Sequence, residues 1–302
     1  MESGLLLIDK PVGPTSAKVV QRVKAIMGAR KVGHLGSLDP FASGLLLVGV
    51  NDGTKVAEIF LNEQKSYTGI ITLGVETDTE DRTGQVLEVR DAPDLDQRDL
   101  ERLQTAFTGS LRQVPPMFSA LNRGGVPLYR LARQGKTVPR PAREIHIESL
   151  RLWKLNGAEL GFEVICSKGT YIRTMAADMG RTLGCGGHLK SLRRLTCGHL
   201  SVDQAVSMDE VQSMKEDKGE VPLVPLARVL GHFRQVPLGA REESWLRAGR
   251  QEMLLELGLP KDGERMVCVS DMGGGLVALA QWVHGESGGR WQLFRVFTRG
   301  DK

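Results

Sequence analysis

The 302-residue chain lacks the features that define several large classes of protein. No apolar run approaches the length of a membrane span, and no basic segment precedes a longer apolar run at the N-terminus. There is no P-loop and no G-x-G-x-x-G motif, and Gly273-Gly-Gly-Leu276 indicates only a turn. Internal repeats and low-complexity tracts are absent as well. We therefore expect no membrane segment, no signal peptide and no nucleotide cofactor.

Cysteine is scarce: Cys166, Cys185, Cys197 and Cys268 are scattered, and no two form a C-x-x-C pair. This usage is typical of reduced thiols, so we expect a cytoplasmic protein. Cys185-Gly-Gly-His188 brings two potential metal ligands together, but no second ligand pair lies at zinc spacing. We interpret these residues as packing and expect neither a metal nor another cofactor.

The composition is that of an ordinary globular protein, with 41% hydrophobic and 25% charged residues. The length suits one large domain and a small one. The 36 glycines favour a strand-rich fold over a helical bundle.

Charges of opposite sign are segregated along the chain, although the net charge is only +4. Residues 76–101 contain ten acids and three bases, whereas residues 122–151 contain seven bases and two acids. Residues 181–200 contain four bases and no acid. This distribution suits a polyanion bound on one face, but solvated basic loops would produce the same pattern.

Hydrophobic periodicity and turn residues predict strands and helices that alternate irregularly. The predicted strands are 5–8, 45–50, 65–75, 85–90, 144–155, 159–167 and 188–195. The predicted helices are 15–27, 55–61, 96–107, 128–133, 170–183 and 201–211. After a charged, proline-marked break, short strands at 265–269, 276–283 and 291–296 indicate a compact β-rich module. We predict an α+β fold with a mixed or antiparallel sheet in residues 1–228 and a second domain in residues 229–302.

Asp39 lies in the densest motif of the chain, a glycine-punctuated segment from Lys31 to Leu45. The following proline biases Asp39 toward an extended or turn conformation, and the glycines allow close approach of backbone or ligand. Such an aspartate can be a turn residue that caps a backbone amide, or a functional carboxylate on a rigid loop.

Three further segments carry chemically useful side chains. Lys65 and Tyr67 are two residues apart on a predicted strand and therefore share a face. Tyr171 and Arg173 lie where a predicted strand passes into a helix, and residues 190–195 interleave apolar and basic side chains. Aromatic side chains stack on unpaired bases, while Arg and Lys bind phosphates. Each residue also has a structural interpretation: Tyr67 as a half-buried strand residue, Arg173 as a surface residue, and Leu192 as core.

Read together, these segments resemble the TruB family of tRNA pseudouridine synthases. The matching segments, in family order across about 200 residues, are GLLLIDKPVGPTS, KVGHLGSLDPFASGLL, KSYTGIITLG, PPMFSALNRGGVPLYRLARQG and CSKGTYIRTMAADMG. Ser37 stands where the family more often has Thr, a conservative departure. The resemblance implies a pseudouridine-synthase catalytic domain with a mixed, mainly antiparallel sheet. It also implies a small C-terminal PUA-like RNA-binding β-barrel, although the match there is weaker.

The resemblance implies a role for each candidate residue. Asp39 would be the catalytic aspartate, which attacks the nucleotide or promotes glycosidic cleavage. Tyr67 would stack on the target uracil and assist the late removal of its C5 proton, and Arg173 would pair with Asp39 and keep it ionised. His34 would fill the space that the flipped uridine leaves.

The remaining candidates are expected to bind substrate. Leu192 and Tyr171 would line the pocket, Lys65 would contribute positive charge, and Arg193 would bind RNA. The substrate would be uridine 55 in the T-loop of tRNA, with a basic segment at residues 117–141 over the T-arm and the C-terminal domain near the acceptor stem. We expect a monomer that needs no protein partner. The alternatives are a non-catalytic tRNA-binding or tRNA-folding protein of the same fold and a guide-RNA-dependent relative that needs partner proteins.

Overall fold

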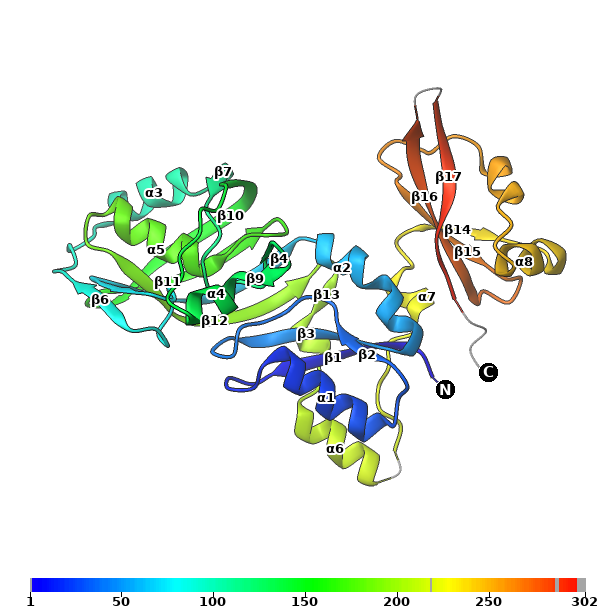
Figure 1. The fold of residues 1–302 in the computed structure, drawn as a ribbon, viewed down its shortest axis with the longest axis horizontal. Helices are drawn as coiled ribbons and strands as arrows, with labels where there is room; N and C mark the ends of the chain where they lie inside the picture. The colour runs from blue at the N-terminus through cyan, green and yellow to red at the C-terminus, as the bar shows by residue number, and fades with distance from the viewer. Residues whose placement is uncertain (1, 218, 286–287, 298–302) are drawn as a thin grey trace.

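A mixed nine-stranded sheet forms the centre of the molecule (Figure 1). The computed structural model describes residues 2–217, 219–285 and 288–297. The main path of the sheet is β1-β3-β12-β4-β11-β10-β7, with β2 paired to β3 and β13 paired to β12. Its strands are β1 (Gly4–Lys10), β2 (Val32–His34), β3 (Ser43–Val50), β4 (Lys65–Leu73), β7 (Gly109–Gln113), β10 (Arg143–Asn156), β11 (Glu159–Cys166), β12 (Gly187–Cys197) and β13 (Leu200–Ser201).

The sheet consists of two antiparallel halves joined by one short parallel pairing. Arg193 and Arg194 of β12 pair with Ser43 and Gly44 of β3, and the other pairings of this sheet are antiparallel. The predicted α+β fold with a mixed, mainly antiparallel sheet is therefore confirmed. Within the described residues, no helix is long and apolar enough to cross a membrane.

Side chains alternate along the strands. At β1 and β3, α2 (Ala57–Asn62) and α7 (Leu226–Val229) pack on one face of the sheet, and the other face of these strands, continued by β4, is covered by a larger group of helices. Tyr67, Ile71 and Leu73 of β4 are buried against this face, whereas Thr68 and Ile70 point to the other. The helices are α1 (Ser16–Met27), α2 (Ala57–Asn62), α3 (Gln97–Ala106), α4 (Leu128–Arg133), α5 (Ile172–Thr182), α6 (Met208–Glu216), α7 (Leu226–Val229) and α8 (Ala240–Arg247), with 3-10 turns at Asn51–Val56, Val202–Gln204 and Glu252–Leu257. Residues from α1, α3, α5 and α6 share one buried cluster with β1, β3, β4, β10, β11 and β12.

The observed α1 agrees with the predicted helix 15–27, and capping residues define both of its ends. The Thr15 side chain accepts a hydrogen bond from the backbone N–H of Lys18, and Gly28 ends the helix at φ 59°. The predicted helix at 201–211 is wrong in its first half. There the chain forms β13 and a 3-10 turn, and the backbone of Val206 bonds to Leu7 of β1, so α6 begins only at Met208.

The C-terminal module is a four-stranded sheet beside α8, rich in strands as predicted. It comprises β14 (Arg234–Pro237), β15 (Met266–Ser270), β16 (Leu276–Gly285) and β17 (Gly288–Val296), paired in that order. These pairings do not close the described strands into the barrel that the resemblance implied. The sequence missed α8 and β14. The remaining short strands form two hairpins, β5 (Val75–Thr77) with β6 (Val86–Val89) and β8 (Asn122–Arg123) with β9 (Val126–Pro127).

The two sheets meet near α2 and α7 (Figure 1). A second buried cluster contains Leu7 and Leu45 of the large sheet together with Leu230 and Leu279 of the C-terminal part. The Lys55 ammonium also donates to the Val296 carbonyl at 2.8 Å. Apolar packing therefore continues across the boundary predicted at residue 228.

Candidate active site

The loop between β2 and β3 holds Asp39 in a fixed position. The Ser16 hydroxyl at the start of α1 donates to the Leu38 carbonyl at 3.0 Å and accepts from the Leu38 N–H at 2.8 Å. Behind Asp39, the Ala42 N–H donates to the Asp39 carbonyl at 3.1 Å. A buried hydroxyl that satisfies both polar groups of one peptide makes the loop costly to displace.

The structure brings Arg173 and Asp39 together. Arg173 lies in the first turn of α5, and its Nε is 3.0 Å from Asp39 Oδ2. The two Nη groups donate to the carbonyls of Thr79 at 3.0 Å and Phe118 at 2.8 Å. The Arg173 side chain is 6% exposed, whereas Asp39 is 41% exposed. The guanidinium is thus buried behind the carboxylate, which is accessible from the surface.

Asp81 is a member of this cluster that the sequence did not single out. Its Oδ2 is 3.9 Å from Arg173 Nε, and its side chain is 6% exposed. The other oxygen, Oδ1, accepts from the Thr79 hydroxyl and the Thr83 N–H, both at 2.8 Å. Asp81 lies in the acidic stretch 76–101, where nothing in the sequence distinguishes it from its solvated neighbours.

The surroundings of Asp39 raise the pKa of its carboxyl group. Desolvation by the surrounding protein is the main cause, although 41% of the side chain is exposed; the Arg173 charge opposes the rise, and the nearby Asp81 charge adds to it. The resemblance implies that Arg173 keeps Asp39 ionised, and its charge does favour the ionised form, but desolvation and Asp81 act in the opposite direction. The ionised form of Asp39 is therefore a less stable and more reactive carboxylate than one in water.

Lys10 supplies a second cation near Asp39. The side chain is fully buried at the end of β1, and its ammonium donates to the carbonyls of Pro11 at 2.8 Å and Pro14 at 2.9 Å. Burial lowers the pKa of Lys10 to about 8, although the Asp39 charge opposes this change. The charge state of Lys10 therefore changes just above neutral pH.

Tyr67 and Leu192 lie on the helix-covered face of the sheet and belong to its buried cluster. Burial raises the pKa of Tyr67 to about 12, and the Arg194 charge opposes this rise. Tyr67 is therefore a phenol at neutral pH. Leu192 pairs with Gly69 of β4, which is two residues from Tyr67, so Leu192 and Tyr67 are neighbours on the same face of the sheet.

Tyr171 directly precedes α5, whereas His34 lies in β2 of the other half of the sheet. The Gln113 side chain accepts from the Tyr171 N–H at 2.8 Å and donates to the Tyr171 carbonyl at 3.0 Å, which fixes the residue before α5. His34 is exposed in β2, and partial burial of its ring lowers the pKa of the imidazole, so the neutral form is favoured.

Two of the basic candidates, Lys65 and Arg193, bond to other groups of the same chain. The Lys65 ammonium donates to the carbonyls of Phe60 at 3.0 Å, Leu61 at 3.3 Å and Glu63, which uses all three of its donors at the end of α2. Lys65 and Tyr67 do share a face of β4 as predicted, but Lys65 serves the fold and has no donor left for a substrate. The Arg193 guanidinium forms a two-pronged ion pair with Asp9, at 2.9 and 2.7 Å.

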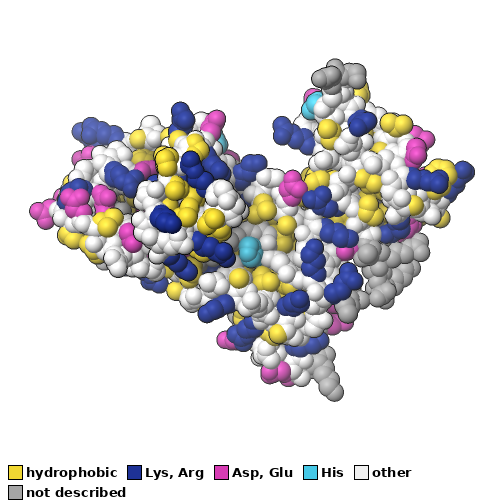
Figure 2. Space-filling view, viewed as in Figure 1, with side chains coloured by type: hydrophobic (Ala, Val, Ile, Leu, Met, Phe, Trp, Pro, Cys, Tyr) yellow, Lys and Arg dark blue, Asp and Glu magenta, His cyan; other side chains and the backbone are white. Residues whose placement is uncertain are grey.

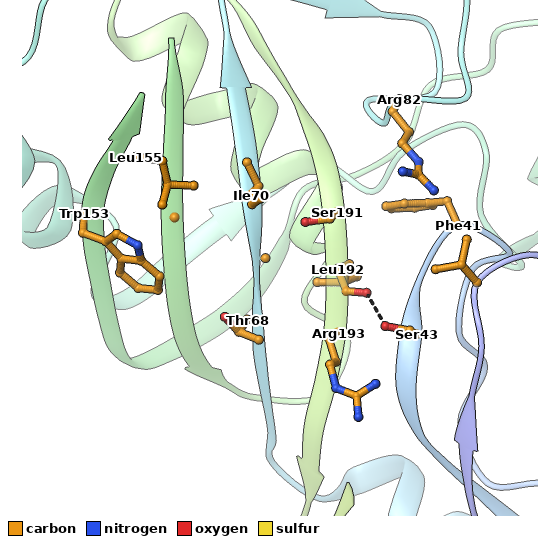
Figure 3. Close-up of a pocket in the computed structure, with 13 residues that line it drawn as sticks. Phe41, Ser43, Thr68, Ile70, Arg82, Trp153, Leu155, Ser191, Leu192 and Arg193 are labelled. Carbon is orange, nitrogen blue, oxygen red and sulfur yellow. Dashed lines mark hydrogen bonds between the residues drawn. The ribbon is translucent and has the colours of Figure 1, made fainter. Parts of the chain in front are cut away.

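A groove of about 400 Å³ crosses the other face of the sheet, and Figure 3 shows the side chains that line it. Thr68 and Ile70 point into it because they alternate with Tyr67 along β4. Leu192 and Arg193 also border the groove, whereas Asp39, Tyr67 and Arg173 do not. Phe41 and Arg82, which border it as well, lie close to Asp39 and Asp81 in the sequence.

Basic side chains gather around the hollow in the middle of the face in Figure 2. In the same view, Figure 1 places α4 and β9 at this hollow. These elements belong to the segment 117–141, in which Arg123, Arg130, Arg133 and Lys136 are exposed. A cleft bordered by exposed cations suits a polyanionic ligand.

Comparisons with known proteins identify the family. The N-terminal domain model of the TruB family of pseudouridylate synthases matches residues 24–172, and the C-terminal domain model of tRNA pseudouridylate synthase B matches residues 173–231. A protein from Geobacter sulfurreducens named tRNA pseudouridine synthase B is 44% identical over 248 residues, which are 82% of this chain and 81% of that protein. The chain belongs to the TruB family. It is therefore a pseudouridine synthase, which is an isomerase.

The TruB relationship extends over the whole chain. The protein of the same name from Syntrophotalea carbinolica is 38% identical over 305 aligned positions, 99% of each chain. Among solved structures, a Cbf5-Nop10-Gar1 complex contains a chain with a TM-score of 0.71 at 24% identity, covering 98% of this chain and 85% of that one. That likeness shows a shared fold.

No described group of three or more His, Cys, Asp or Glu side chains could hold a metal ion. Cys185 and His188 have separate packing partners: the thiol donates to the Gly186 carbonyl at 3.3 Å, and His188 Nδ1 lies 2.8 Å from the Val75 carbonyl oxygen. Their interpretation as packing residues agrees with these contacts.

Proposed function

We propose that this TruB-family enzyme isomerises uridine 55 in the T-loop of tRNA to pseudouridine. The observation that carries the proposal is the Arg173–Asp39 ion pair at 3.0 Å, in which the Asp39 side chain is 41% exposed and therefore accessible to a ligand. The curated relatives named tRNA pseudouridine synthase B support tRNA as the substrate.

The reaction requires no net oxidation, reduction or hydrolysis. The N1–C1′ bond breaks, the uracil rotates within the site, and a C5–C1′ bond forms, while C5 loses a proton and N1 gains one. Asp39 acts as a carboxylate, either on the nucleotide directly or by promoting glycosidic cleavage. Asp39 is 41% exposed in the free enzyme, so bound RNA must cover it to exclude water and retain the detached base.

The uridine must leave its stack before it can reach Asp39. Extrusion of a base costs a few kcal/mol, and stacking on an aromatic side chain returns about 1–3 kcal/mol. We assign this stacking to Tyr67, with Leu192 and Tyr171 as neighbouring walls and His34 in the space left in the loop. Because Tyr67 is a phenol at neutral pH, it is a weak base for the C5 proton in the free enzyme.

We further propose that the basic segment 117–141 contacts the T-arm and that the C-terminal module approaches the acceptor stem. The exposed cations and the paired glycines Gly124 and Gly125, both with positive φ, support a segment that closes on RNA. In this proposal the enzyme acts in the cytoplasm as a monomer, without a partner protein.

A tRNA transcript incubated with the enzyme and then mapped for pseudouridine tests the proposal. Modification confined to uridine 55 by the wild type, and none by Asp39→Asn with binding within a few-fold, is the expected result. Equal turnover by both would remove Asp39 from the chemistry. Binding without modification by the wild type would favour the non-catalytic tRNA-binding alternative.

A further inference from the structure

Arg194 of β12 is a buried cation that the mechanism above does not use. It is 2% exposed, and no ion pair to a carboxylate is found for it among the described residues. Its donors go to three backbone carbonyls: Nε to Leu45 at 2.6 Å, Nη2 to Gly36 at 3.2 Å and Nη1 to Ser37 at 3.4 Å. The guanidinium is also hydrogen-bonded to the Tyr67 side chain, so the groups that hold it are neutral.

The position of Arg194 connects the two catalytic elements. Its backbone pairs with Gly44 of β3 on one side and with Tyr67 of β4 on the other, at the short parallel pairing that joins the two halves of the sheet. Its side chain bonds to Gly36 and Ser37, and Ser37 lies two residues before Asp39. One residue thus links the Asp39 loop to the strand that carries Tyr67.

Stability alone does not account for a charge at this place. Burial of an ionised group costs several kcal/mol, and well-packed apolar side chains often replace buried charges without loss of stability. The Arg194 charge also affects the site, because it lowers the pKa of Lys10 and of His34 and opposes the rise in the pKa of Tyr67. Its field therefore reaches groups that surround the cleft.

We propose that Arg194 is a positioning residue that fixes the Asp39 loop against the Tyr67 strand and holds an uncompensated positive charge beneath the cleft. The inference rests on the proposed function. When the N1–C1′ bond breaks, its electron pair stays on the uracil, and the base is anionic until C5 bonds to C1′. A fixed cation in surroundings of low dielectric favours that charge without reorganisation.

The test compares three variants of the full-length enzyme with tRNA transcript. Arg194→Met removes the charge and the guanidinium donors, and Arg194→Lys keeps the charge but loses the planar fork. Arg102→Met, on α3 with an 80% exposed side chain, is the control. Single-turnover rate, tRNA affinity, thermal unfolding and the pH dependence of the rate are measured for each.

We expect Arg194→Met to lower the single-turnover rate about 10²- to 10³-fold, the size reported for loss of one preorganised donor, with affinity within threefold. Arg194→Lys should react about tenfold faster than Arg194→Met. We assign the alkaline limb of the pH profile to Lys10, so it should move to higher pH in Arg194→Met and stay in place in Arg102→Met, since Arg194 lowers the pKa of Lys10.

Two results would overturn the inference. One is a rate for Arg194→Met within threefold of wild type. The other is an equal loss in both Arg194 variants with an unshifted alkaline limb, because that pattern indicates only a role in folding. If Arg194→Met does not fold, the rate and pH profile of Arg194→Lys decide between the same outcomes. An inactive wild type would instead refute the proposed function.

Discussion

At the scale of single residues, the cleft holds Asp39 in surroundings that favour its protonated form. A carboxyl group with a raised pKa in the folded protein binds its proton more tightly than in the unfolded chain. Its contribution to stability is therefore fully present below the unfolded pKa and is lost as the pH rises through the folded pKa. At neutral pH the ionised Asp39 is a local cost that the rest of the fold offsets.

Asp39→Asn should therefore separate activity from stability. We expect the single-turnover rate to fall about 10⁴-fold or more, as for loss of a nucleophile, while the melting temperature at neutral pH rises. The gain should shrink as the pH falls through the pKa of Asp39, where the wild type also carries a neutral side chain. Scanning calorimetry of both proteins across pH measures this difference in melting temperature. A variant less stable than wild type at neutral pH would show that the ion pair with Arg173 outweighs burial.

Lys10→Met should change the pH dependence of the reaction. Lys10 is charged below pH 8 and favours ionisation of Asp39, so its loss raises the pKa of Asp39 further. We expect the rising acidic limb of the rate profile to move to higher pH, the inflection near pH 8 to disappear, and the rate at neutral pH to fall about tenfold or more. Single-turnover rates across pH check both limbs. An inflection near pH 8 that survives in the variant would assign it to another group.

The sequence allowed Asp39, Tyr67 and Arg173 to be selected because each lies in a local motif with several matching neighbours. Asp81 and Arg194 could not be selected in the same way, because their importance depends on contacts distant in the chain. The sequence did contain one indication that Arg194 could be buried. Two adjacent arginines on a strand must face opposite sides of the sheet, so one of Arg193 and Arg194 had to point inward.

At the scale of elements, the pairing of β3 with β12 requires a glycine at position 44. Gly44 has φ +97°, and a Cβ there would lie 2.2 Å from the backbone oxygen of Arg194. This pairing joins the halves of the sheet and sets the distance between the Asp39 loop and Tyr67. The prediction from sequence that the glycines of this motif allow close backbone approach agrees with the contact at Gly44.

Gly44→Ala should destabilise the enzyme far more than a matched change elsewhere. Gly135→Ala is the control, because Gly135 also has a positive φ, +71°, but open space around its Cβ position. Gly135→Ala should lower the free energy of unfolding only by the cost of a left-handed backbone conformation, about 1–2 kcal/mol. Gly44→Ala should cost that amount plus the displacement of β12, and it should slow turnover in the folded fraction. Urea unfolding of both variants makes the comparison, and equal costs would show that the strand pairing adjusts freely.

Element boundaries were predictable where local signals act alone and failed where tertiary contacts decide. The capping residues of α1 placed both of its ends correctly. Between residues 201 and 207 the sequence has helical spacing, but Val206 bonds to β1, and Ser207 then caps a new helix. That break depends on an edge strand almost 200 positions earlier, which local periodicity does not reveal.

At the scale of the whole molecule, two sheets share one buried cluster, and the basic segment 117–141 lies at the hollow in Figure 2. The shared cluster packs the C-terminal module against the large sheet. The segregation of charge along the sequence predicted a basic face, and the exposed cations of this segment lie on it. We therefore expect the chemistry to depend on the Arg173–Asp39 pair and RNA binding to depend on the exposed cations of segment 117–141.

Replacement of Arg130 and Arg133 by Gln tests that division. Both side chains are exposed, and neither contacts the Arg173–Asp39 pair, so the rate at saturating tRNA should stay within about twofold. Each lost phosphate contact should reduce the slope of log affinity against log salt by about 0.7–0.9. The control is the pair Arg98→Gln and Arg102→Gln, exposed on α3 in the acidic part of the chain. A salt slope unchanged in the first pair, or equally reduced in both, would place the RNA on another surface.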